Sequence, residues 1–269
     1  MSATRQLMPT ATRPVADTNP SPLAAAYVLR IGDSCLIHAQ RLAEWCGHAP
    51  VLEEDIALTN IALDHIGQAR MSLTLAGHIE GRGRDEDALA FQRLERDYCN
   101  VAMLELPNGD FARTLLRCFL WASFMSVLWA ALGDSSDEQL AAIATKSLKE
   151  TRYHHRHTAD WVVRLGDGTD ESHRRMHQAL TELWPYTAEW FSPDEVDVAA
   201  AASRLGPSWF DLKPAWLTLV APVLEEAKLT APTVTSFMSS GKRGVHTEHM
   251  GFLLAEMQSL PRAFPGAVW

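Results

Sequence analysis

The sequence predicts an all-α protein built on a long four-helix bundle, with additional shorter helices in its C-terminal part. Three observations support this fold class. Apolar residues recur at three- and four-residue steps wherever a pattern can be read, as between Leu140 and Leu165. Proline is absent from 51–106 and from 108–184, which permits helices of more than about 20 residues. We find no alternating strand pattern bounded by turn residues.

The N-terminal segment differs from the rest of the chain. Four of the 14 prolines lie in the first 22 residues, a Ser-, Thr- and Ala-rich stretch without hydrophobic periodicity. We therefore expect residues 1–22 to form a disordered arm and residues 23–269 to form one helical domain. Prolines return between Pro185 and Pro265, so the last third should contain shorter, broken helices.

Four long helices are expected in the remaining sequence. The first runs over 23–45 and ends at the sequence CGHAP; the second runs over 52–77. The third, at 111–132, is apolar nearly all round and must be buried on most sides. Asp137 is suited to cap the start of the fourth, and Gly166 to end it.

Composition excludes several classes of protein. The 269 residues are 47% hydrophobic, which is enough for a sizeable core. The net charge of −9 argues against a nucleic-acid-binding surface. No apolar run approaches the roughly 18 residues of a membrane span, and no signal-peptide layout opens the chain. We expect a cytoplasmic protein.

The cysteines are spread without a C-x-x-C motif, which argues against a zinc ribbon or a disulfide framework. We interpret them as buried free thiols in a reducing compartment. The four residues are Cys35, Cys46, Cys99 and Cys118.

A four-helix bundle of this size can hold a carboxylate-bridged di-iron centre. Such a centre takes one Glu from each of two helices and a Glu-x-x-His pair from each of the other two. The three-residue spacing places both side chains on one helix face. None of the 11 histidines follows a glutamate by three residues; only His173 follows an acid, Asp170, at a predicted helix start. The standard ligand set is therefore absent.

An outline of such a site nevertheless remains. Gly67 and Tyr153 stand three residues after acids, where histidines would be needed, and His154 is rotated by about 100° from the required face. We call these positions the degenerate site: Glu44, Asp64, Gly67, Glu150, Tyr153 and His154.

Buried carboxylates without a metal need partners. We therefore favour a metal-free, salt-bridged polar core. The arginines available on the same helices are Arg41, Arg70, Arg152 and Arg156.

Two further motifs are less specific. In the run YHHRH, only His154 with His157, or Tyr153 with His157, can share a helix face, which favours packing over metal binding. In the turn GKRG, Lys242 and Arg243 could contact a phosphate of a nucleotide-bearing ligand, an acidic partner or water.

Nine tryptophans are present. Most fall at helical spacings and are expected in the core, although such a surplus also suits a protein interface. No G-x-S-x-G motif or other nucleophile motif is present, and we assign no catalytic residue.

A family resemblance covers the chain from about Ala24 to Trp269. The matching segments include LRIGDSCLIHAQRLAEWCGHAP, EEDIALTNIALDHIGQAR, DEDALAFQRLERDYCN, ELPNGDFA, KETRYHH, LGDGTDES and GKRGVHTEHMGFLLAEMQSL. In order and spacing they closely resemble the structural C subunits of multicomponent phenylacetyl-CoA epoxidases. Within them EWCGHAP, LPNG and HTEHMG are long enough to be specific.

The resemblance implies a ferritin-like fold and a complex with a catalytic A subunit that carries the di-iron centre. It also implies a small B subunit and a reductase subunit that delivers electrons from NADPH. In that family the complex epoxidises the aromatic ring of phenylacetyl-CoA with O2, and the C subunit is a degenerate relative that serves as a scaffold. The wholly non-ionisable FLWASFM departs from the family's pattern and argues further against metal.

By the same resemblance, two segments correspond to places where the C subunit approaches the CoA substrate. These residues are Asp97, Tyr98, Cys99, Asn100, Val198, Ala199 and Ala200.

Three hypotheses remain open from the sequence. The first is a non-catalytic ferritin-like subunit that stabilises a di-iron partner. The second is a catalytic oxygenase subunit with a variant ligand set, and the third is an unrelated all-helical interaction protein. The variant ligand set would be Glu44, Asp64, Glu150 and His154.

Overall fold

The computed structural model describes residues 21–233 and 237–267. Within these ranges the chain is all-helical, without a strand, which confirms the predicted fold class. The helices are α1 (Pro22–Ala43), α2 (Leu52–Glu80), α3 (Glu86–Phe91), α4 (Phe111–Leu132), α5 (Glu138–Gly166), α6 (Asp170–Leu183), α7 (Thr187–Trp190), α8 (Glu195–Ser203), α9 (Lys213–Glu226), α10 (Glu248–Met257) and α11 (Ser259–Ala263). Short 3₁₀ turns are η1 (Glu95–Asp97), η2 (Ala102–Glu105), η3 (Trp184–Tyr186), η4 (Trp209–Leu212) and η5 (Gly241–Arg243).

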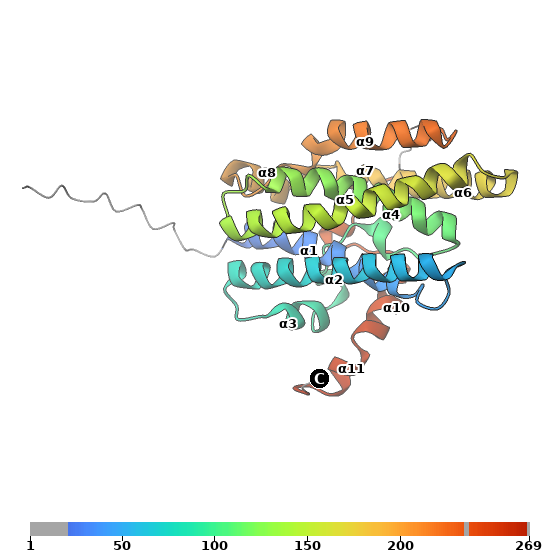
Figure 1. Ribbon diagram of the computed structural model, residues 1–269. Coiled ribbons are helices and arrows are strands. Elements are labelled where there is room, and N and C mark those ends of the chain that lie inside the picture. Colours follow the sequence, from blue (N-terminus) through green and yellow to red (C-terminus); the bar gives the residue numbers. More distant parts are fainter. Residues whose placement is uncertain (1–20, 234–236, 268–269) are drawn as a thin grey trace, which may run out of the picture.

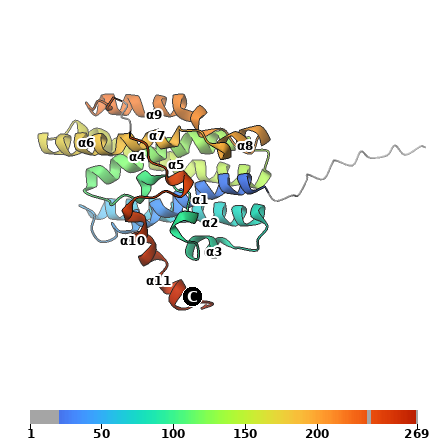
Figure 2. The same ribbon diagram turned by 180° about the vertical axis from the view of Figure 1, so that it is seen from behind.

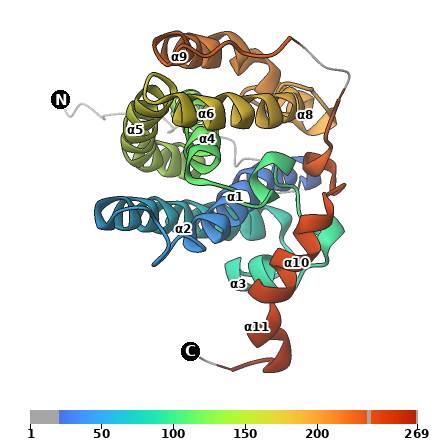
Figure 3. The same cartoon turned by 90° about the vertical axis from the view of Figure 1, so that its right-hand side faces the viewer.

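The four long helices form the predicted bundle. Helix α1 packs along α2 and helix α4 along α5, so that two helical hairpins lie against each other (Figures 1 and 3). Helix α9 covers the α4–α5 side, and the view from behind shows α6, α7 and α8 in one row beneath it (Figure 2). Helices α6 to α9 therefore pack onto one side of the bundle.

Local capping explains where the helices begin. The side chains of Ser21, Asp110 and Asp137 each accept a hydrogen bond from a backbone N–H in the first turn of α1, α4 and α5. Helix α4 has the predicted bounds. Helix α2 continues past the predicted end to Glu80, because the left-handed conformation that closes it lies at Gly81, with φ +67°.

The first helix begins at Pro22, inside the segment predicted as a disordered arm, and ends at Ala43 rather than Trp45. Ser21 caps this helix, and proline in the first turn loses no intrahelical hydrogen bond. The rest of the predicted arm lies outside the described residues.

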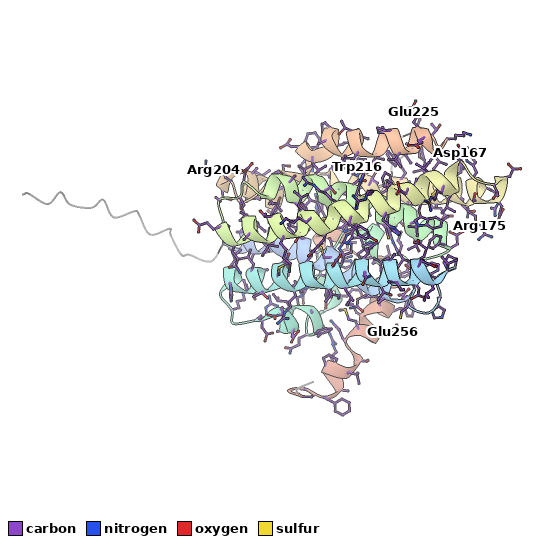
Figure 4. All side chains as sticks on the ribbon, in the orientation of Figure 1. Asp167, Arg175, Arg204, Trp216, Glu225 and Glu256 are labelled. Carbon is purple, nitrogen blue, oxygen red and sulfur yellow. The ribbon has the colours of Figure 1, made fainter. Side chains whose placement is uncertain are left out.

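The core centres on α4 and on an aromatic cluster beneath α9. Trp121, Phe124 and Trp190 contact one another with ring centroids 5.3–5.6 Å apart. Figure 4 labels Trp216 on α9, whose Nε1 donates to the carbonyl of Leu120 at 3.1 Å. The core interpretation of the tryptophans is confirmed for five that are at most 1% exposed, namely Trp121, Trp129, Trp190, Trp209 and Trp216.

Helix α4 corrects one statement made from the sequence. An 18-residue window of this helix has a mean hydropathy of 1.7, so an apolar run long enough to cross a membrane does exist. Within the molecule 78% of that window is buried by the surrounding helices. The sequence did not reveal this run because two arginines, Arg113 and Arg117, interrupt its start. Helix α4 is the core helix of the bundle.

The cysteines are free thiols, but only two are buried as expected. Cys35 and Cys118 lie in the core, whereas Cys46 is exposed and Cys99 half-buried. Cys46 lies in the turn after α1, where no other described element covers it, and the spacing of the sequence did not reveal this.

Helices α10 and α11 project away from the bundle (Figures 1 and 3). We call residues 248–267 the C-terminal arm; Figure 4 labels Glu256 on it. The arm exposes Phe252, Leu260 and Phe264, which are 72%, 57% and 58% accessible. Met250, Leu253 and Leu254 of the same arm are buried against the core, so these exposed side chains lie on its outer face and at its end.

Candidate functional site

Three imidazoles meet in the middle of the bundle. His38 comes from α1, His65 from α2 and His154 from α5, and each is at most 1% exposed. The ring centroids of His38 and His65 are 4.9 Å apart, and those of His65 and His154 are 5.2 Å apart. We call these three residues the histidine cluster.

Hydrogen bonds connect the cluster to polar groups at its edge. His154 Nε2 lies 2.8 Å from Asp64 Oδ2. Gln68 Nε2 donates to Glu150 Oε2 at 3.1 Å, and the Cys35 thiol donates to Gln68 Oε1 at 3.7 Å. Each carboxylate next to the cluster therefore already has a partner from a facing helix.

Two rings of the cluster are electrically neutral. Burial lowers the pKa of His38 well below its usual value, and the nearby His65 and Arg117 lower it further. Burial also lowers the pKa of His65, and the proximity of His154 adds to this effect. Both ring nitrogens of His38 lack a hydrogen-bond partner among the described residues. A charged ring at this position would be uncompensated, so the neutral form predominates at neutral pH.

The structure brings only part of the degenerate site together. Asp64 and Glu150 lie beside the histidine cluster on α2 and α5. Gly67, on α2, has no side chain to offer as a ligand, and Tyr153 points outward with 43% of its surface exposed. The two positions at which a di-iron site would need histidines, 67 and 153, therefore contribute no imidazole.

Glu44 belongs to a different environment at the end of α1. Its carboxylate accepts hydrogen bonds from Arg41 Nη1 at 2.6 Å and from Asn108 Nδ2 at 2.9 Å, and 42% of its side chain is exposed. These bonds fix the loop between η2 and α4 to the end of α1. Glu44 has no bond to the cluster among the described residues, so the geometry does not favour the variant ligand set.

The predicted salt-bridged polar core is not found at any of the four arginines. Arg41 pairs with Glu44, but at the end of α1, where 42% of the Glu44 side chain is exposed. Arg70 instead pairs with Glu86 of α3, while the two arginines of α5, Arg152 and Arg156, are exposed on the outer surface. Their positions on the helix turn them away from the bundle axis, and histidine and glutamine take their place beside the carboxylates.

A di-iron centre does not fit these residues. It requires carboxylates and imidazoles that converge on the metals from four helices. Within residues 21–233 and 237–267 no group of three or more His, Cys, Asp or Glu side chains is arranged to hold a metal ion. The carboxylates next to the cluster bond to imidazole and amide groups, and α4 supplies no ionisable ligand from its FLWASFM segment.

The run YHHRH has the predicted arrangement on α5. The rings of Tyr153 and His157 stack with centroids 5.8 Å apart and an interplanar angle of 18°. His157 Nε2 lies 3.0 Å from Glu54 Oε2 on α2. The contact of His157 with Glu54 therefore links α5 to α2, and the rings of Tyr153 and His157 pack against each other on the outer surface of α5.

Residues 97–100, the first segment that the resemblance places near the CoA substrate, lie partly inside the protein. Tyr98 is fully buried; its hydroxyl donates to the carbonyl of Ala90 and accepts a bond from Gln258 Nε2 at 2.7 Å. Asn100 is also fully buried, and its Nδ2 donates to Glu105 at 2.9 Å. Cys99 is half-buried and Asp97 exposed, so they are the accessible members of this segment.

The second segment lies on α8. Val198 is 64% exposed, Ala199 is half-buried and Ala200 is in the core. A role of either segment in substrate contact stays a prediction.

The two cations of the GKRG turn, Lys242 and Arg243, differ in their exposure to solvent. Lys242 is 5% exposed; its Nζ donates to the carbonyl of Ser192 at 2.9 Å and lies 3.4 Å from Asp197 Oδ2. Burial lowers the pKa of Lys242, and Arg30 lowers it further. Arg243 is exposed. Of the two, Arg243 is therefore the one available to a ligand or partner.

Sequence reasoning missed the histidine cluster because only histidines three residues after an acid were sought. His65 follows the buried Ile61 by four residues and precedes the buried Ala69 by four. Apolar periodicity alone does not select the buried face of α2, because Ile56, Leu63 and Ile66 recur at the same helical spacing and are exposed. His38 lies seven residues after the buried Ile31 on α1, so the periodicity of that helix could have shown that His38 faces the core.

Comparison with known proteins identifies the relatives of this chain. The C subunit of the 1,2-phenylacetyl-CoA epoxidase of Escherichia coli (strain K12) is 48% identical over 244 residues, which cover 91% of this chain and 98% of that protein. The family described as phenylacetic acid catabolic protein matches residues 8–269. These matches rule out the hypothesis of an unrelated helical protein. The chain therefore belongs to the phenylacetic acid catabolic protein family.

Proposed function

We propose that this chain is the non-catalytic C subunit of a phenylacetyl-CoA epoxidase and that it supports the catalytic, di-iron-bearing A subunit. The observation that carries the proposal is the polar centre of the bundle. There Asp64 bonds to His154 and Glu150 to Gln68, so the acids that would ligate iron have protein partners instead. A bundle with such a centre contributes to a complex through its shape and its surface, as a scaffold does.

Helix α2 offers a surface for such a partner. Leu52, Ile56 and Leu63 are 72%, 54% and 61% exposed, and Ile66 is 38% exposed. Their spacing places them on one face of α2, which we call the apolar stripe. Exposed apolar residues gathered on one face mark protein interaction sites. The exposed phenylalanines of the C-terminal arm add a second apolar surface.

The remaining components follow from the epoxidase assignment. The di-iron centre belongs to the A subunit, the electrons come from NADPH through a reductase subunit, and the complex also contains a small B subunit. Phenylacetyl-CoA is the substrate of the complex, and the location is the cytoplasm. A contact with the CoA part would come from the accessible residues among those predicted, which are Asp97, Cys99, Val198, Ala199 and Arg243.

Iron content and turnover test the absence of catalysis. We expect Glu150→Gln to leave both the iron content and the turnover of the assembled complex unchanged, because Glu150 accepts a hydrogen bond from Gln68 and no metal bond. Elemental analysis of the chain purified alone should give no stoichiometric iron. Two irons per chain in an ordered site, or loss of turnover in an assembled Glu150→Gln complex, would show that this chain is catalytic.

Association with the A subunit tests the scaffold role. Replacing Ile56 and Leu63 by Glu should prevent co-purification, because charged groups would have to be buried in the interface. Phe210→Glu on η4 is the matched control, since Phe210 is 53% exposed and lies outside the apolar stripe. If the double variant co-purifies as well as the control does, the apolar stripe is not the contact surface.

A further inference from the structure

The outer face of α5 carries a row of cations that no ion pair accounts for. They recur at steps of three, three and four residues, so they follow one side of the helix over about 15 Å. All are exposed, and within the described ranges none forms an ion pair. We call this row the basic face: Lys146, Lys149, Arg152 and Arg156.

The basic face contrasts with the charge of the rest of the protein. The chain as a whole has a net charge of −9, and many of its other cations are paired, as in Arg93 with Asp33 and Arg84 with Glu80. Within 146–156 Glu150 is the single acid, and it is engaged by Gln68 on the inner side. Like charges spaced three and four residues apart destabilise a helix, so this row gives the isolated subunit no stabilisation.

An aromatic side chain lies among these cations. Tyr153 is 43% exposed, and its ring is held by stacking on His157 and by the guanidinium of Arg156 at 6.0 Å. Tyrosine and arginine are enriched at the centres of protein interfaces, where a rigid ring supplies contact area with little loss of entropy. The ring therefore gives the basic face an apolar anchor.

We propose that the basic face of α5 is the docking site for an acidic protein surface on another chain of the epoxidase complex. The deduction rests on the proposed function, because it takes the partner from that complex. A single phosphate group would need donors that converge on one point, whereas these cations are spread along a convex helix. An acidic helix or loop of similar length matches both their spread and their charge.

Carbodiimide coupling of the intact complex tests the contact directly. This reagent joins an amine to a carboxylate without a spacer, so Lys146 and Lys149 should become linked to Asp or Glu residues of another chain. Mass spectrometry of the digested complex would identify both ends. Links to a second copy of this chain, or the absence of any link from both lysines, would overturn the proposal.

Charge reversal provides the second measurement. We expect Arg152→Glu/Arg156→Glu to lower the association rate with the partner about tenfold at low salt, since charges at an interface act mainly on the encounter. The difference should vanish near 1 M salt, where the Debye length falls to about 3 Å. Arg82→Glu/Arg204→Glu is the control with the same change in net charge on exposed arginines outside the basic face.

The outcomes separate this inference from the proposed function. If the wild-type chain forms no complex with the epoxidase subunits, the proposed function itself is wrong. If the complex forms and the two reversed variants associate at equal rates, the scaffold role stands and the docking role of the basic face is wrong.

Discussion

Mild acid should destabilise this protein through the histidine cluster. The folded state keeps His38 and His65 neutral, because burial lowers the pKa of each well below the usual value of 6.5. The unfolded chain takes up protons at both positions as the pH falls through 6.5. Since the unfolded state then binds more protons, the free energy of unfolding must fall with pH.

The magnitude follows from the two shifts. Between about pH 6.5 and pH 5.5 each ring that stays neutral in the folded state costs about 1 kcal/mol, so the two cost about 2 kcal/mol. His155, whose pKa burial also lowers, adds a change of the same sign.

His246 affects the free energy of unfolding at a higher pH than the histidine cluster does. Burial alone would lower its pKa, but the hydrogen bond and the charge of Glu105 raise it overall. Its stabilising contribution is therefore complete below pH 6.5 and is lost only as the pH rises through the raised pKa.

The variant His38→Leu isolates the effect. It removes two buried ring nitrogens that lack partners among the described residues, which should stabilise the protein by about 1 kcal/mol near pH 7.5. It should also reduce the loss of stability between about pH 6.5 and pH 5.5 by about 1 kcal/mol. His78→Leu, at an exposed position on the same helix as His65, is the control that should change neither quantity.

Urea unfolding followed by tryptophan fluorescence, repeated over this pH range, measures these differences. The reasoning is refuted if the free energy of unfolding of the wild type is constant between pH 6.5 and 5.5. It is refuted equally if His38→Leu loses as much stability on acidification as the wild type does.

Two further substitutions test the packing of the C-terminal part. Glu105→Gln should lower the free energy of unfolding by about 2 kcal/mol, because Glu105 accepts bonds from Asn100, His246 and the backbone of Thr247. Limited proteolysis measures the effect: the C-terminal arm should be cleaved faster in the variant, and an unchanged cleavage rate would contradict the prediction. Gly166→Ala should cost about 1–3 kcal/mol and lower the Tm, because the added Cβ would lie 2.5 Å from the carbonyl oxygen of Ala227; an unchanged Tm would show that α9 can shift freely.

The sequence predicted the bundle well because its elements have strong local signals. Asp137 as a cap, the proline-free segments and the apolar sequence of 111–132 each restrict the backbone by themselves. The end of α2 was predicted too early because Gly77 is the first glycine of three near the end of this helix. The left-handed conformation that closes the helix occurs at the second, Gly81.

The candidate site was harder to predict, because it depends on which residues of different helices face one another. The sequence grouped Glu44, Asp64, Glu150 and His154; the structure places the last three near one another and Glu44 apart from them, with Arg41 and Asn108. It paired the acids with arginines, since charge was the available criterion. Contacts between helices decide otherwise, and they bring Gln68 and the histidine cluster to the acids.

The groups of the candidate site are ordered by burial from the centre of the bundle outward. The innermost groups, His38 and His65, are neutral, while Asp64 lies farther out, with 38% of its side chain exposed. A di-iron bundle requires the reverse order, with carboxylates innermost, because the cations compensate the cost of burying them. A glutamate introduced at position 38 would place an uncompensated charge among neutral rings. A single substitution to glutamate at the centre of this bundle would therefore cost stability instead of creating a metal site.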